Sequence, residues 1–96
     1  MSLFDKYWGS RVPAWALGLG AKGYHALMGM VAAELRARGL EFRFGDGLVS
    51  ISAEGVSLEL DLRALVELCA QRPHADWEQI VVARIDECLG RGGLAP

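Results

Sequence analysis

Apolar residues recur at every third or fourth position between residues 21 and 38, which is the period of an α-helix. Gly39 is suited to end this helix. Arg36 and Arg38 precede it in the last turn, where positive charges interact favourably with the helix dipole. The apolar face of the predicted helix consists of Tyr24, Leu27, Met28, Val31 and Leu35. A second stripe beside it consists of Ala26, Met30, Ala33 and Ala37. Because a helix that is apolar over most of its girth is usually buried on more than one side, we expect the second stripe to contact something as well.

Between residues 41 and 60 the pattern changes to an alternation of apolar and polar residues, which is the period of a β-strand. Asp46-Gly47 and Glu54-Gly55 interrupt the alternation, and such dipeptides are typical of tight hairpin turns. We therefore predict a three-stranded antiparallel meander with one apolar and one polar face. The residues expected to face the helices are Phe42, Phe44, Val49, Ile51, Val56, Leu58 and Leu60. Those expected to face away are Arg43, Ser50, Ser52, Ser57 and Glu59.

Two further helices are predicted after the strands, over residues 61–71 and 75–89. Asp61 can cap the first of them, and the break at Pro73 separates the two. The predicted fold class is therefore α+β, with an N-terminal helix, a three-stranded antiparallel meander and two C-terminal helices. The chain is expected to consist of an aromatic lead-in over residues 1–20, a single α+β domain over residues 21–89 and a flexible tail over residues 90–96.

Composition narrows the classes of protein that the chain can belong to. The 96 residues suffice for one domain, and a hydrophobic fraction of 52% excludes a disordered chain. A net charge of −2 gives no general attraction for nucleic acids or anionic membranes. No apolar run approaches the ~20 residues that span a bilayer, and the N-terminus does not read as a secretory signal. We therefore expect a cytoplasmic protein that binds neither nucleic acid nor membrane.

Three glycines raise the question of nucleotide binding. Gly18, Gly20 and Gly23 have the G-x-G-x-x-G spacing of a dinucleotide-binding turn, and a predicted helix follows them. In such a turn the glycines follow a buried strand, whereas the segment before Gly18 is short and contains Pro13. The hairpins that follow also do not fit a doubly wound sheet. A nucleotide-binding protein or enzyme using these glycines is the alternative hypothesis, and the favoured interpretation includes no cofactor.

The remaining reactive residues predict neither catalysis nor metal binding. Cys69, His74 and Asp76 are close in sequence, but catalytic partners are assembled in space, and Cys69 belongs to an apolar helix face. We therefore expect a buried, inert thiol and no catalytic residues. Cys69 and Cys88 fall roughly 16 Å out of step on an antiparallel helix pair, so we predict two free thiols. The histidines and cysteines show no metal-ligand spacing, so no metal is expected.

Protein interaction is the function that these patterns favour. Aromatic residues are enriched at binding hot spots, and the lead-in either caps the core or binds a partner with them. The stripe that contains Met30 and Ala33 has no obvious partner within the chain. We therefore predict a homodimer with these two residues near its centre and Trp8 or Trp15 at its edge. The chain is interpreted as a small non-enzymatic interaction module, an adaptor or regulatory subunit, whose partners are itself and a further protein.

Two segments, EFRFGDGLVSI and DLRALVELCAQRPHADWEQIVVARI, resemble parts of uncharacterised bacterial proteins. In those proteins a hairpin leads into a helix pair with a Leu-x-x-Leu pattern, a short break and then Trp-x-x-Ile-Val. The resemblance covers about half of the chain, and the matching residues are Leu62, Leu65, Leu68, Trp77, Ile80 and Val81. Because these are core positions, the resemblance implies a fold but neither an activity nor any site residue.

Overall fold

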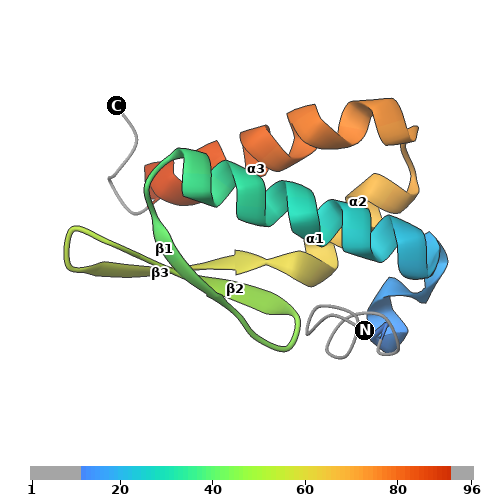
Figure 1. Cartoon of the computed structure of the whole chain (residues 1–96), viewed down its shortest axis with the longest axis horizontal. Helices are drawn as coiled ribbons and strands as arrows, with labels where there is room; N and C mark the ends of the chain where they lie inside the picture. The colour runs from blue at the N-terminus through green and yellow to red at the C-terminus, as the bar shows by residue number, and fades with distance from the viewer. Residues whose placement is uncertain (1–11, 92–96) are drawn as a thin grey trace, which may run out of the picture.

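The computed structural model describes residues 12–91 and shows a three-stranded sheet with helices packed on it (Figure 1). Its elements are η2 (Ala14–Leu19), α1 (Gly20–Ala37), β1 (Glu41–Phe44), β2 (Leu48–Ala53), β3 (Val56–Asp61), α2 (Leu62–Ala70), η3 (His74–Asp76) and α3 (Trp77–Arg91). The α+β class and the three-stranded antiparallel sheet are confirmed. The element order departs from the prediction by the two short 3₁₀ helices, η2 before α1 and η3 before α3.

The sheet is a meander in which each strand pairs antiparallel with the next one along the chain. Ile51 of β2 lies opposite both Phe42 of β1 and Leu58 of β3, so the three side chains share one face of the sheet. Both predicted hairpin turns are present. At the second turn, Glu54 and Gly55 have φ values of 51° and 78°, which is the backbone conformation that a two-residue type I′ turn needs.

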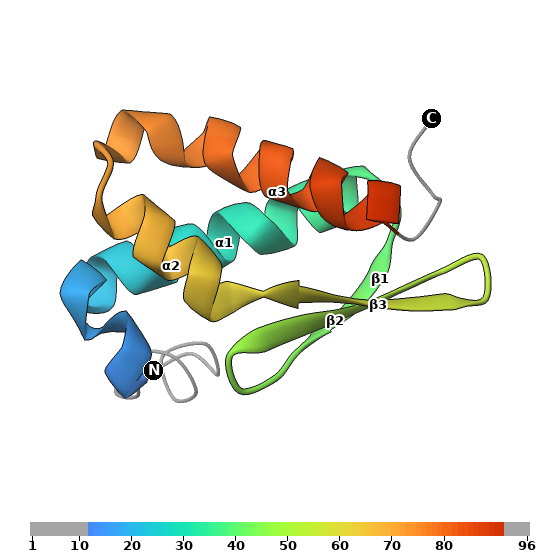
Figure 2. The same ribbon diagram turned by 180° about the vertical axis from the view of Figure 1, so that it is seen from behind.

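The two faces of the sheet differ as the alternation predicts. The buried or half-buried residues on the helix side are Phe42, Phe44, Val49, Ile51, Val56, Leu58 and Leu60. The opposite face carries the exposed residues Glu41, Arg43, Ser52, Ser57 and Glu59, together with the half-buried Ser50. Figure 2 shows the strands from behind, with α2 following directly from the end of β3. The register is therefore the one that buries the apolar side chains.

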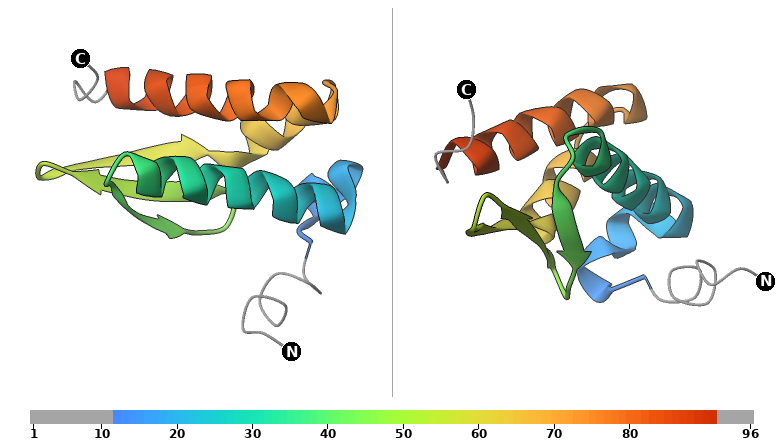
Figure 3. Two further views of the ribbon diagram at one scale, coloured as in Figure 1. Left: turned by 45° about the horizontal axis from the view of Figure 1, so that its top comes forward. Right: turned by 60° about the vertical axis from the view of Figure 1, so that its left-hand side comes forward.

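Helices α1 and α3 lie side by side and run in the same direction (Figures 1 and 3). Near their beginnings, a Cβ added to Gly23 would lie 3.3 Å from the ring of Trp77, so the lack of a side chain at Gly23 permits this approach. Near their ends, the Arg38 guanidinium contacts Asp86 of α3 at 2.5 Å and Glu34 of α1 at 2.7 Å. The two helices are thus joined at both ends.

The turn between α2 and α3 is fixed by an indole. Trp77 is 7% exposed, and its Nε1 donates hydrogen bonds to the carbonyl oxygens of Cys69 at 2.9 Å and Arg72 at 3.3 Å. Pro73 is followed by the short 3₁₀ helix η3. Helix α3 therefore begins only at Trp77, two residues later than the predicted start of the third helix. Asp61 caps α2 as predicted, because its carboxylate accepts hydrogen bonds from the backbone N–H groups of Arg63 and Ala64.

Part of the aromatic lead-in belongs to the core. In η2, Ala16 is completely buried, and Trp15 and Leu19 are half-buried against the core. This short helix contacts both α1 and α2. Residues 14–19 therefore cap the core, which is one of the two roles considered for the lead-in. Residues 1–11, with Trp8, lie outside the described residues, as do residues 92–96 of the predicted tail.

Candidate functional site

The second stripe of α1 is turned only partly away from the core, because Ala26 and Met30 still pack against the core cluster. Ala33 and Ala37 are exposed, whereas Ala26 and Met30 are half-buried. Ala33 follows the buried Tyr24 by nine positions, and at about 100° per residue the two side chains point in opposite directions. We call the four residues the small-residue strip. Its exposed alanines give a helix surface that another backbone can approach closely.

The surface of α3 has a hollow of mixed polar and apolar composition. This shallow hollow of about 500 Å³ is lined by Ala75, Glu78, Gln79, Val82, Ala83 and Asp86. Asp86 also pairs with Arg38, so the hollow reaches the line along which α3 meets α1. This side of α3 was not among the surfaces predicted from the sequence. The spacing of Ala75, Val82 and Ala83 was a usable signal, since these residues recur at helical intervals outside the predicted core face.

The structure does not bring Trp15 to the small-residue strip. The Trp15 ring meets the ring of Tyr24 edge-on, with centroids 5.9 Å apart, on the core side of α1. Its indole Nε1 is buried and has no hydrogen-bond partner in the part of the chain that the structure describes. Of the four residues predicted to bind a partner, Met30 and Ala33 therefore lie together, Trp15 lies elsewhere, and Trp8 is outside the described residues.

The three glycines do not form a strand–turn–helix unit. Gly18 lies within η2, and Gly23 lies inside α1, where its missing Cβ makes room for Trp77. Gly20 has a φ of 74°, which suits the change from the 3₁₀ helix to α1. Residues 12 and 13 precede η2 without forming a strand. Backbone conformation accounts for Gly20 and close packing for Gly23, nothing in the structure explains Gly18, and no phosphate-binding turn is built from the three.

We expect NAD and ATP to leave the melting temperature unchanged in a thermal-shift assay. A nucleotide present at a hundred times its Kd would add about 2.7 kcal/mol to the free energy of unfolding, which such an assay detects. The matched control is Gly18→Ala, because a Cβ at Gly18 would contact nothing within 4 Å and the variant should fold normally. Stabilisation of the wild type by either nucleotide, lost in Gly18→Ala, would instead support the nucleotide-binding hypothesis.

Cys69 has the character of a core residue. It is completely buried, and loss of solvation raises the pKa of its thiol to about 11, so the thiolate is scarce at neutral pH. The ring of His74 lies against Trp77, with centroids 4.6 Å apart, rather than against the thiol. Between residues 12 and 91, no hydrogen bond joins the side chains of Cys69, His74 and Asp76. These three residues therefore do not form a nucleophilic set.

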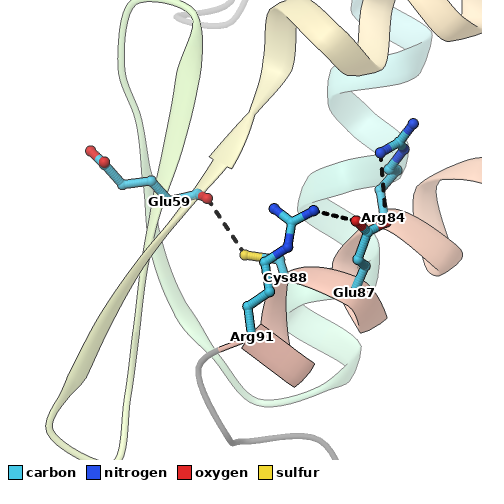
Figure 4. A network of polar contacts seen from close by, with 5 residues as sticks. All are labelled: Glu59, Arg84, Glu87, Cys88 and Arg91. Atoms are coloured by element: carbon cyan, nitrogen blue, oxygen red, sulfur yellow. Dashed lines mark hydrogen bonds and ion pairs between the residues drawn. The ribbon is translucent and has the colours of Figure 1, made fainter.

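Cys88 lies in a polar network at the end of α3 (Figure 4). Its thiol donates a hydrogen bond to the carbonyl oxygen of Glu59 on β3, with a sulfur–oxygen distance of 3.6 Å. Glu87 pairs with Arg91 and also with Arg84, the latter at 3.6 Å. Burial raises the pKa of the Cys88 thiol, and the nearby Arg91 opposes this effect. Both cysteines are unbridged, as predicted, and the contact of Cys88 is one that holds α3 to the sheet.

Within the described range, no three histidine, cysteine, aspartate or glutamate side chains lie close enough together to hold a metal ion. None of the described helices has the length and apolar character needed to cross a membrane.

Comparison of the chain with protein-family models, with curated proteins and with solved structures finds no match. The surfaces of this chain are therefore the features that bear on its function.

Proposed function

We propose that the protein is a small non-enzymatic interaction module that forms a homodimer through the small-residue strip of α1. The observation that carries this proposal is the exposure of Ala33 and Ala37 on a helix that is apolar on both its inner and outer sides. Exposed charged residues would be expected at these positions if the surface only met water. An adaptor or regulatory subunit acting in the cytoplasm, with a further protein as its second partner, is the role that we assign to it.

The chemistry of the strip supports close helix packing between two copies. Alanine side chains let the backbones of two helices approach each other, and the flexible side chain of Met30 can fill an uneven gap. A two-fold arrangement is the commonest way in which such a surface is covered by its own copy. In that arrangement Met30 and Ala33 lie near the centre of the interface.

Sedimentation equilibrium should show a dimer for the wild type within the concentration range up to ~100 µM. Ala33→Glu should give a monomer that keeps its helical circular dichroism, because two buried, unpaired carboxylates would face each other across the interface. The matched control is Ala64→Glu, which places the same charge at an exposed position of α2, away from the strip.

A wild type that is monomeric throughout this range would refute the homodimer. If instead the wild type is dimeric and Ala33→Glu stays dimeric, the interface lies elsewhere on the molecule. Dissociation by the Ala64→Glu control alone would place the interface on α2. A folded Ala33→Glu monomer beside a dimeric control is the combination that supports the proposal.

A further inference from the structure

We draw no further inference here: the strongest candidate, the hollow of about 650 Å³ between the α1–β1 turn, the β2–β3 hairpin and the last turns of α3, carries none, because its exposed Glu41 and Glu54 and its already paired Arg38 select no class of ligand and nothing in the structure shows what fills it.

Discussion

Replacing Trp77 with alanine should lower the free energy of unfolding by about 3–5 kcal/mol, a large part of the stability of a small domain. The indole is buried where the beginning of α1 meets the α2–α3 turn, and it packs against Gly23. Truncation leaves a cavity there, because the glycine has no side chain that could fill it. The substitution also removes the indole N–H group, which donates hydrogen bonds to the carbonyl oxygens of Cys69 and Arg72.

Urea unfolding followed by far-ultraviolet circular dichroism measures this loss, with every variant at one protein concentration because association would add to the apparent stability. Trp77→Phe is the informative control, since it keeps an aromatic ring but lacks the N–H group. We expect this variant to lose about 1–2 kcal/mol, mainly through the missing hydrogen bonds. A loss below about 1 kcal/mol for Trp77→Ala would mean that the ring does not hold the three helices together.

Replacing Ile51 with alanine should cost about 2–5 kcal/mol of unfolding free energy. Ile51 is completely buried at the centre of the sheet, between Phe42 on β1 and Leu58 on β3. The same measurement on Ser52→Ala provides the matched control, because Ser52 is the next residue and points to the exposed face. That variant should change the stability by less than about 0.5 kcal/mol.

The pair of variants tests the register of β2 directly. Adjacent residues of a strand point to opposite faces, so a shift of one residue would exchange the two outcomes. A large loss for Ser52→Ala together with a small one for Ile51→Ala would therefore contradict the pairing of Ile51 with Leu58. Equal small losses for both variants would mean that the sheet is not the centre of the core.

The sheet was predictable because its signals are local. The alternation of apolar and polar residues sets which side chains share a face, and the Glu54-Gly55 dipeptide places the second turn. The position of η2 was not predictable in the same way. Ala16 is completely buried against other elements, but no periodic pattern surrounds it, since Pro13 and Gly18 interrupt the sequence on both sides. Contacts with α1 and α2, which are distant in sequence, decide where it lies.

The candidate surface was predictable only in part, for the same physical reason. Helical spacing alone places Met30 and Ala33 on one side of α1, and the structure keeps them there. The location of Trp15 depends on the direction in which η2 folds back, and it packs on Tyr24 at the opposite side of the helix. The position of α3 beside α1 depends on contacts between elements distant in sequence, such as Trp77 against Gly23 and Arg38 with Asp86.

The parallel arrangement of α1 and α3 has an electrical consequence. Each helix has a macrodipole equivalent to roughly half an elementary charge at either end, and in parallel helices these contributions add instead of cancelling. Both helices finish at the end of the molecule where the Glu54-Gly55 hairpin lies (Figures 1 and 2). Near that end, Arg38 and Arg91 are paired with carboxylates, whereas Arg36 in the last turn of α1 lies over the ring of Phe42. The dipoles of α1 and α3 therefore both contribute negative potential at the hairpin end of the described residues and positive potential at the other end, a contribution that the net charge of −2 does not reveal.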